Sequence, residues 1–510
     1  MLPPLIGDAA TRVSGDTPFA PNCTGGSLGG NEYRNAEVEP YAAVNPVNAA
    51  NIVVVWQQDR WSTGLSSGNV GATTLDGGAT WTRSMAPFSR CAGGNASNGG
   101  DYERATDPWV TFAPNGNAFQ MALATIGASM TPGSVSAMLV SRSTDSGRTW
   151  SNPSTLIRDG SLFFNDKNSI TADPTDTNYV YAVWDRLAAS GGGPTLFART
   201  TDGGDTWEAA RSIFDPGPRS QTIGNVIAVL PNGMLINLFT QLDEAAGGQI
   251  TATLNVLRSN DKGGSWSGPI RVAGMQPVGA RDPETGTAIR DGATLAQIAV
   301  APNGDVFVVW QDSRFSGGAR DGIALSRSID GGLTWSTPVQ VNSVPGTQAF
   351  TPSVHVRGNG TIAVTYYDFR SNTPDAATLP TELMFTRSTD GITWQENRLS
   401  ATFDMVAAPF SRGLFIGDYH ALVSANNVFI PVYVRTNSGD LFNRTDVFAQ
   451  PMRSLPLAAS SSTPTYRAQA ATGEQADAAA RQRVHDAIVR TMEHRIPGWW
   501  QRWNQRRSTP

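Results

Sequence analysis

The chain has 510 residues, of which 40% are hydrophobic and 16% are charged, and its formal net charge is −5. This hydrophobic content is ordinary for a globular protein, and the lack of a basic excess argues against a nucleic-acid partner. No apolar run reaches the roughly 18 residues that a membrane-spanning helix needs, so we expect no membrane span.

Residues 1–35 form an N-terminal segment without the features of a secretion signal. MLPPLIGDAATRVSG has neither a basic start nor a long apolar stretch. The chain is therefore either intracellular or written without its signal, and we expect a secreted or periplasmic protein whose signal peptide is not present in this sequence. The two cysteines, Cys23 and Cys91, lie in loops rich in Gly and Asn. We expect one disulfide in an oxidising compartment, with two unpaired thiols as the alternative.

Six segments between residues 73 and 394 share an Asp, a Gly and a following Trp, as in SRSTDSGRTW. The aspartates are Asp76, Asp145, Asp202, Asp261, Asp330 and Asp390, and they are separated by 57 to 69 residues. A catalytic residue is needed once, so six copies predict a structural role. The carboxylate is expected to accept backbone N–H groups within its own turn, while Gly permits a positive φ and Trp packs between sheets.

Each repeat reads as four short strands separated by turn residues. In the fifth repeat the strands are TLAQIAVAPNG, DVFVVWQDSRF, GIALSRSIDGG and LTWSTPVQV. Four antiparallel strands repeating at about 60 residues are typical of a β-propeller, which we predict for residues 36–453. The segment GDYHALVSANNVFIPVYVRTNSGDLFNRTDVF supplies about three more strands without the turn, and a strand from residues 10–35 could complete that sheet. We therefore predict an all-β propeller of seven blades, with six as the alternative.

The pattern Ser/Thr-x-Asp-x-Gly-x-Thr-Trp resembles the Asp-box, or BNR repeat, of sialidases and sialidase-like glycosidases. The same repeat occurs in sortilin-type and photosystem-assembly propellers. With its flanking strands the resemblance covers about residues 35–450, and it is most similar to bacterial exo-α-sialidase-like proteins. It implies that the boxes lie on the rim, and that an active site for a terminal acidic or related sugar lies at one mouth of the central channel.

Polar residues near the starts of the predicted inner strands are the candidates for that site. They are Glu37, Glu39, Asp107, Asp166, Lys167, Arg290, Asp291, Asp418, Tyr419 and His420. Acidic and basic groups that converge in a concave place usually mark a binding site. The alternative is a ring of solvated or hydrogen-bonded strand ends.

The family resemblance implies specific roles. Tyr419 in GDYHALV corresponds to the tyrosine nucleophile, while Asp59 and Glu244 fit the acid/base and the tyrosine-activating carboxylate by order along the chain. Arg34, Arg290 and Arg370 are the candidates that bind the substrate carboxylate.

We expect Asp107, Asp291, Asp418 and His420 to contact substrate as well. The chain has EYRNAEVEP where the family has Arg-Ile-Pro. This departure favours two alternatives to a sialidase: a non-catalytic propeller that binds glycan or protein, and a polysaccharide lyase that uses His420 and Tyr419.

A second recurring pattern competes for the arginines. Several second strands end in a pattern of Trp or Tyr followed by Asp and Arg. The arginines of this pattern are Arg60, Arg186, Arg314 and Arg370. Repetition again favours structure, and we expect an Asp–Arg pair that steadies the following loop. No metal site or cofactor is assigned, because the four histidines are scattered. Ca²⁺ at the strand ends stays open as an alternative.

The composition changes after about residue 453. Residues 454–475 read as a linker of small residues, and residues 476–510 as a helix followed by a tail rich in Trp and Arg. We expect the aromatic cluster of Trp499, Trp500 and Trp503 to dock on the propeller. The alternative is a contact with a partner, a glycan or a membrane surface.

Overall fold

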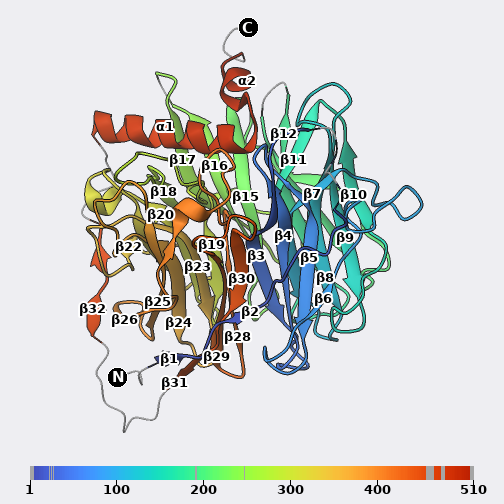
Figure 1. Cartoon of the computed structure of the whole chain (residues 1–510), viewed down its shortest axis with the longest axis horizontal. Coiled ribbons are helices and arrows are strands. Elements are labelled where there is room, and N and C mark those ends of the chain that lie inside the picture. The colour runs from blue at the N-terminus through green and yellow to red at the C-terminus, as the bar shows by residue number, and fades with distance from the viewer. Residues whose placement is uncertain are drawn as a thin grey trace.

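The computed structural model describes residues 5–505, except for residues 22, 24–25, 27, 190–191, 246, 455–463 and 472–476. These residues form an all-β fold of four-stranded antiparallel sheets, as predicted, with α1 and α2 at the C-terminal end (Figure 1). Neither helix is long and apolar enough to cross a membrane, within the part of the chain that the structure describes.

Six successive groups of four antiparallel strands follow the six repeats in chain order. Their bounds are β3 (Glu32–Val44), β4 (Ile52–Trp61), β5 (Ser66–Thr74) and β6 (Thr82–Ser84); β7 (Arg104–Phe112), β8 (Ala118–Ile126), β9 (Val135–Ser143) and β10 (Ser154–Asp159); β11 (Phe163–Ala172), β12 (Val180–Ala188), β13 (Thr195–Thr200) and β14 (Arg211–Phe214); β15 (Ser220–Val229), β16 (Leu235–Glu244), β17 (Ile250–Ser259) and β18 (Ile270–Met275); β19 (Gln297–Val300), β20 (Val306–Asp312), β21 (Gly322–Ser328) and β22 (Val339–Gln340); β23 (Ala349–Val356), β24 (Ile362–Asp368), β25 (Pro380–Ser388) and β26 (Thr393–Arg398). Every residue of β4 and β20 is buried, because these apolar second strands are covered on both faces.

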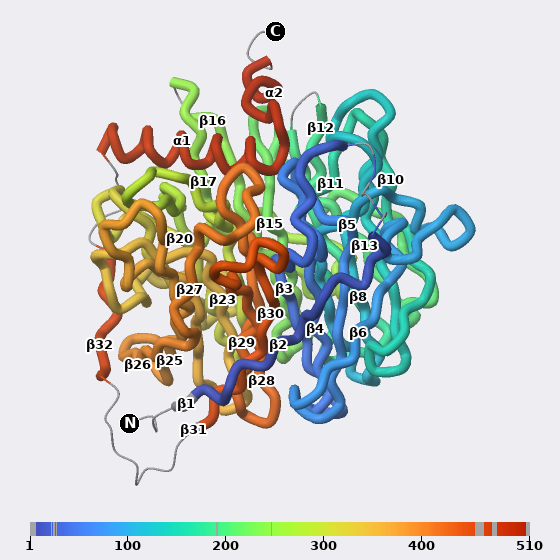
Figure 2. The backbone as a smooth tube through the Cα atoms, in the orientation of Figure 1, coloured from blue at the N-terminus to red at the C-terminus, as the bar shows by residue number. Residues whose placement is uncertain are grey.

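The last group of strands joins the two ends of the chain. Its strands are β28 (Ala421–Ala425), β29 (Val428–Thr436), β30 (Thr445–Ala449) and β2 (Thr11–Arg12), and nearby β1 (Leu5–Gly7) pairs with β31 (Met452–Ser454). β2 lies beside β30 in Figure 2 and pairs with it in an antiparallel manner. A strand from the N-terminal segment therefore completes the last sheet, as the sequence suggested.

The first strands of the groups contact one another in succession. β3 contacts β7, and the series continues through β11, β15, β19, β23 and β28, which in turn contacts β3. Shorter elements lie between the groups: η1 (Arg314–Ser316), η2 (Met405–Ala407) and β27 (Phe403–Asp404). The ends of the first strands are thereby brought close together, and this positions the candidate site.

The repeated turn is a hydrogen-bonded clasp at the edge of each sheet. In SRSTDSGRTW, Asp145 accepts hydrogen bonds from the Ser143 hydroxyl at 2.8 Å and from the Thr149 backbone at 2.9 Å. Burial acts to raise the pKa of Asp145, but these hydrogen bonds hold it below its ordinary value. The Trp150 indole donates to Ser84 of the preceding group at 3.0 Å. The turn thus ties two neighbouring sheets together.

The expected linker at 454–475 contains two short strands within its described residues. β32 (Thr465–Arg467) pairs with β26, and β33 (Gln469–Ala470) pairs with β22. Both β26 and β22 are edge strands of their groups, and an edge strand offers unpaired backbone groups to a passing segment. This part of the chain is therefore attached to the sheets.

Helix α1 (Ala478–Arg495) lies across one end of the sheets in Figure 1, and α2 (Trp499–Gln505) follows it. Asp477 caps α1 by accepting the Ala480 N–H at 2.7 Å. The apolar face of α1 belongs to the same hydrophobic core as the sheets, through Val484, Ile488 and Met492. On α2, the Trp499 indole donates to Gln221 of β15 at 2.9 Å.

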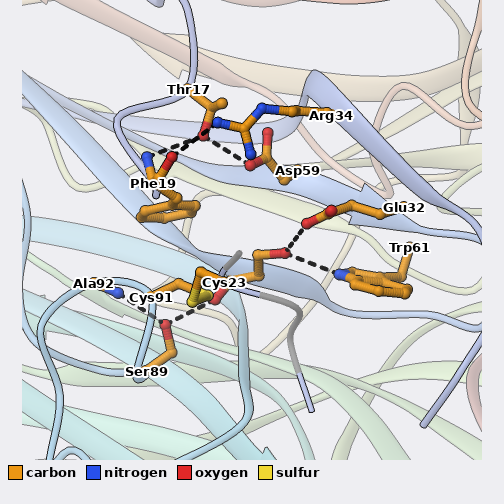
Figure 3. Close-up of a disulfide and its surroundings, with 11 residues drawn as sticks. Thr17, Phe19, Cys23, Glu32, Arg34, Asp59, Trp61, Ser89, Cys91 and Ala92 are labelled. Carbon is orange, nitrogen blue, oxygen red and sulfur yellow. Dashed lines mark hydrogen bonds between the residues drawn. A yellow bond between two sulfur atoms is a disulfide. The ribbon is translucent and has the colours of Figure 1, made fainter. Parts of the chain in front are cut away.

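Cys23 and Cys91 form the predicted disulfide, which joins the N-terminal segment to the loop between β6 and β7. Figure 3 shows it beside Ser89, whose hydroxyl accepts the Ala92 N–H at 3.4 Å. The two cysteines are 68 residues apart in the chain. The bridge therefore closes a long loop across the first sheet.

We expect the C23S/C91S variant to lose roughly 2–4 kcal/mol of unfolding free energy, because the cross-link restricts the unfolded chain. Thermal melts followed by circular dichroism would show a lower Tm for the variant. Reductant should lower the Tm of the wild type and leave that of the variant unchanged. A wild-type Tm that does not respond to full reduction would contradict this expectation.

Candidate functional site

A cavity of about 230 Å³ lies where the first strands β7 and β11, the end of β4, several loops and the end of α1 meet. We call it the arginine cavity. Its charged lining residues are Arg60, Asp107, Asp166, Lys167, Arg290, Arg412 and Arg495. Four guanidinium groups, one ammonium and two carboxylates thus line one cavity.

A shared β-bulge explains how the strands deliver polar side chains to this place. The antiparallel register shifts in the same part of β3, β7, β11, β15 and β23. At each shift one residue has a positive φ: Glu39 (52°), Asp107 (47°), Lys167 (43°), Gly224 (70°) and Thr351 (49°). This backbone costs a non-glycine residue about 1–2 kcal/mol, so the packing of the strands must enforce it. Bulges of this kind redirect side chains near functional sites.

Three of these bulge residues meet in a buried ion cluster. The Lys167 ammonium lies 2.7 Å from Asp107, 3.3 Å from Glu39 and 2.9 Å from Asp418. Although burial opposes it, Asp107, Asp418 and Glu39 raise the pKa of Lys167. Burial raises the pKa of Glu39 to about 8, despite the nearby ammonium. Lys167 is therefore a fixed positive charge at the cavity wall.

Asp166 is the cavity carboxylate with a shifted pKa. Burial, and then the negative charge of Asp107, raise its pKa to about 6. Its Oδ2 atom accepts no hydrogen bond from the described protein. A carboxyl group that holds its proton up to mildly acidic pH can serve as a general acid.

Arg60 and Arg290 lie over the same aromatic ring. Their guanidinium carbons are 4.4 Å and 4.5 Å from the ring centroid of Phe415. Both also donate to the Ser411 hydroxyl, at 3.1 Å and 3.5 Å. Burial and then the positive charge of Arg290 lower the pKa of Arg60 to about 9. An anion bound between these two groups would relieve their repulsion.

The end of α1 supplies a further guanidinium group. Arg412 donates to the His494 carbonyl at 2.7 Å and to the Thr63 carbonyl at 2.8 Å, which fixes the end of α1 over the cavity. The Arg495 side chain is only 2% exposed and lies 3.9 Å from Asp418. None of its three guanidinium nitrogens finds a hydrogen-bond acceptor among the described residues. Buried donors of this kind usually have a partner, so they point to a ligand.

Five of the candidate residues from the sequence meet at the cavity. Asp107, Asp166, Lys167 and Arg290 line it, and Asp418 lies 3.3 Å from the Arg290 guanidinium. Tyr419 lies outside its lining: the hydroxyl donates to the Pro108 carbonyl at 3.1 Å, and the ring packs against Trp109. Burial and then the charge of Glu39 raise the pKa of Tyr419 well above its ordinary value.

Three predicted site residues are held by nearby loops and strands outside the cavity lining. Asp59 accepts the Thr17 hydroxyl at 2.7 Å, and Arg34 donates to the Phe19 carbonyl at 2.8 Å (Figure 3). Asp291 accepts the Ala280 N–H at 2.7 Å. These contacts give the three side chains local structural roles.

Glu244 and His420 also lie outside the cavity lining. Glu244 is the last residue of β16, and its backbone N–H donates to the Arg219 carbonyl at 3.2 Å. The His420 ring bonds the Thr365 hydroxyl at 2.7 Å, and burial lowers the pKa of this histidine to about 3. A buried histidine that stays neutral in this way is a weak candidate for the base of a lyase.

The recurring Asp–Arg pattern has three different outcomes. Arg314 pairs with Asp312 at 2.8 Å and Arg370 with Asp368 at 2.6 Å, which confirms the expected structural pair in those two copies. Arg186 instead pairs with Asp159 of the neighbouring group, at 2.6 Å. The prediction is wrong for Arg60, whose guanidinium turns to Gln57 and Ser411 because Asp59 is bonded to Thr17.

Sequence reasoning gave Arg60 a structural role and missed Arg412 and Arg495 as site residues. A usable signal for the bulges was present: Glu39, Asp107 and Thr351 each precede a proline inside a first strand. Proline within a sheet is usually confined to edges and bulges, so these pairs mark where the strands break their register.

Within the described ranges, no group of three or more His, Cys, Asp or Glu side chains could hold a metal ion.

Comparison with known proteins identifies the class of repeat. Residues 194–408 match the family described as a BNR repeat-like domain. This match confirms the recognition of the Asp-box, or BNR, repeat in the chain. The turns of Asp76 and Asp145 lie before the matched residues and have the same carboxylate-to-backbone hydrogen bonds.

Several solved structures are similar over most of the chain. A protein of unknown function from Dyadobacter fermentans is 14% identical, with a TM-score of 0.46, and the match covers 84% of this chain and 98% of that one. A leech intramolecular trans-sialidase is 12% identical, with a TM-score of 0.45 and coverage of 84% and 92%. An α-L-arabinofuranosidase of Fusarium graminearum is 14% identical, with a TM-score of 0.44 and coverage of 71% and 92%.

Proposed function

We propose that the sheets are the seven blades of a closed β-propeller. The succession of contacts between first strands, which returns from β28 to β3, supports a ring. The pairing of β2 with β30 supports closure by the N-terminal segment. In this arrangement the arginine cavity lies at one mouth of the channel, under the end of α1. The disulfide supports a secreted or periplasmic location, since such bonds persist in oxidising compartments.

We infer that the protein is a sialidase-like glycoside hydrolase that acts on a terminal acidic sugar of a glycan. The observation that carries this is the convergence of four guanidinium groups on one small cavity, with the donors of Arg495 lacking an acceptor among the described residues. Planar guanidinium groups bind carboxylates through paired hydrogen bonds. A cavity of about 230 Å³ suits a sugar unit better than a long chain.

The two cavity carboxylates have the properties that glycoside hydrolysis needs. Asp166, with its pKa of about 6, donates a proton to the glycosidic oxygen as the bond breaks. Asp107 lies 2.7 Å from the Lys167 ammonium, and its negative charge stabilises the positive sugar ring that develops in the transition state. Water then takes the place of the leaving group, and its proton returns to Asp166.

A panel of fluorogenic glycosides tests this proposal. The wild type should hydrolyse acidic substrates, such as a sialoside or a glucuronide, and should leave a neutral arabinofuranoside intact. The Arg290→Gln variant should raise KM for the acidic substrate. Binding of the acidic sugars without turnover would support a non-catalytic glycan-binding propeller instead. Release of an unsaturated uronate, seen as new absorbance, would support a lyase.

Tyr419→Phe separates this chemistry from that of a tyrosine nucleophile. We expect less than about a tenfold fall in kcat, because the hydroxyl donates to Pro108 and its pKa is raised rather than lowered. The kcat would be measured on the best acidic substrate of the panel, with a thermal melt as the control for folding. A fall of more than about 1,000-fold in a folded variant would restore Tyr419 as the nucleophile.

A further inference from the structure

A second hollow, of about 970 Å³, lies along the other part of α1. We call it the basic groove. Its lining includes five arginines: Arg281, Arg320, Arg370, Arg483 and Arg490. The whole chain carries a net charge of −5, so this local gathering of positive charge is not a property of the general surface. Its volume is at the upper end of the range for ligand sites, which leaves room for more than one sugar unit.

The five arginines differ in whether a carboxylate pairs with them directly. Arg370 pairs with Asp368 and Glu396, at 2.6 Å and 2.8 Å. By contrast, no ion pair among the described residues involves one of the other four arginines, which are Arg281, Arg320, Arg483 and Arg490.

Two acidic residues also line the groove, and both are engaged locally. Asp282 accepts the Glu284 N–H at 2.9 Å within its own turn. Asp486 accepts the Gln482 amide at 2.7 Å along α1. Both carboxylates thus have a local partner, although the charge of Asp486 also acts on Arg490. Positive charge therefore prevails in the groove.

Backbone carbonyls hold three of the guanidinium groups in place without neutralising them. Arg483 donates to the Gly318 carbonyl at 2.7 Å, Arg490 to the Val278 carbonyl at 2.7 Å, and Arg281 to the Gly286 carbonyl at 3.0 Å. A guanidinium group has five N–H donors, so each of these arginines retains donors for a ligand. Burial and then the charge of Arg281 lower the pKa of Arg490, although nearby carboxylates act to raise it.

Helix α1 connects the basic groove with the arginine cavity. Arg483, Asp486 and Arg490 line the groove, whereas His494 and Arg495, at the end of the same helix, line the cavity. Residues three and four apart share one face of a helix, so positions 483, 486 and 490 follow a single stripe that leads toward the cavity. One extended ligand lying along this stripe would reach both sites.

We propose that the basic groove is a second binding site, which holds the acidic chain of a polysaccharide whose terminal sugar occupies the arginine cavity. This inference rests on the proposed function and deepens it, because it makes the substrate a polyanion and not a neutral glycan with one acidic end. Carboxylate and sulfate groups share the chemistry that the arginines recognise, and they are distinguished by experiment.

Binding by the full-length protein tests the groove. Labelled polygalacturonate and dextran sulfate supply the carboxylate and sulfate chains, and unmodified dextran is the neutral control. We expect one of the acidic chains to bind, with an affinity that falls as salt rises. The R320A/R483A variant should bind about tenfold more weakly, since two charge contacts with the ligand are lost. Arg281→Ala, which changes a loop and not the helix, should weaken binding in the same direction.

Arg481→Ala is the matched control, because Arg481 is exposed on the same helix and is not part of the groove lining. Its affinity should equal that of the wild type. An equal loss in R481A, unchanged binding in R320A/R483A, or equally tight binding of dextran or single-stranded DNA would overturn the proposal. Turnover of small acidic glycosides without binding of either acidic chain would overturn the groove alone. Chain binding that R320A/R483A weakens, without any turnover, would overturn the hydrolase alone.

Discussion

Asp166→Asn is expected to lower kcat by roughly 100-fold to 10,000-fold, the usual contribution of a positioned general acid. The asparagine keeps the shape of the side chain but cannot donate a proton to the leaving oxygen. In the wild type the reactive form is the protonated acid, so activity should be highest below a pH of about 6, the pKa of Asp166, and should fall above it. In the variant, the activity should no longer fall as the pH rises above this value. Steady-state rates on either side of this pH would check both expectations.

Glu37→Gln is the matched control for Asp166→Asn. Glu37 is also a buried carboxyl in a first strand, and burial followed by the charge of Asp446 raises its pKa. It lies outside the cavity lining and contacts Gln58 at 2.6 Å. Its variant should keep the wild-type pH profile. A kcat for Asp166→Asn within about tenfold of wild type, at its best pH, would remove Asp166 from the role of general acid.

The stability of the protein should respond to the same carboxyl group. The pKa of Asp166 is higher in the folded chain than in the unfolded chain. At pH values between these two pKa values, folding is therefore accompanied by uptake of a proton. The contribution of Asp166 is therefore most favourable below the unfolded value and is lost as pH rises to about 6. As pH rises, this part of the stability is thus lost before the pH reaches about 6, whereas the activity falls above it.

The repeated turns could be predicted from the sequence because their causes are local. The Ser143 and Thr149 partners of Asp145 lie within four residues of it in the chain. The apolar second strands, such as β20, are also local patterns that show in the sequence. The pairing of β2 with the last group of strands was anticipated from the incomplete last repeat, whereas the strands β32 and β33 depend on which sheet edges the chain passes after folding.

The site was harder to predict because its residues meet only through the tertiary structure. Arg60 resembles the paired arginines Arg314 and Arg370 in sequence, and what separates them is that Thr17 and Asn35 bond the neighbouring Asp59. Arg495 comes from a helix beyond the repeats, so no repeat pattern could include it. Asp107 and Arg290 were found because strand starts were expected to converge, but the depth at which Asp107 sits depends on the bulge in β7.

Arg495→Ala is expected to weaken binding of an acidic sugar by roughly 10-fold to 100-fold, the effect of losing a buried hydrogen bond to a charged group. The wild-type guanidinium is buried, and its nitrogens lack an acceptor among the described residues, so its donors are available to a ligand carboxylate. Its positive charge also acts to lower the pKa of Asp166. The variant should therefore show both a higher Kd and a fall in activity that begins at a higher pH than in the wild type. Calorimetry and the pH–rate profile measure the two effects separately.

The Arg495→Lys variant distinguishes the effect of the positive charge of this residue from the effect of its planar shape. Lysine keeps the positive charge, so the pH profile should stay close to that of the wild type, while the loss of the planar pair of donors should still weaken binding. Arg481→Ala, on the exposed side of α1, should change neither property. Tighter binding by Arg495→Ala would mean that the end of α1 obstructs the cavity, and unchanged binding would mean that it only covers it. Either result would contradict a site that the C-terminal helix completes.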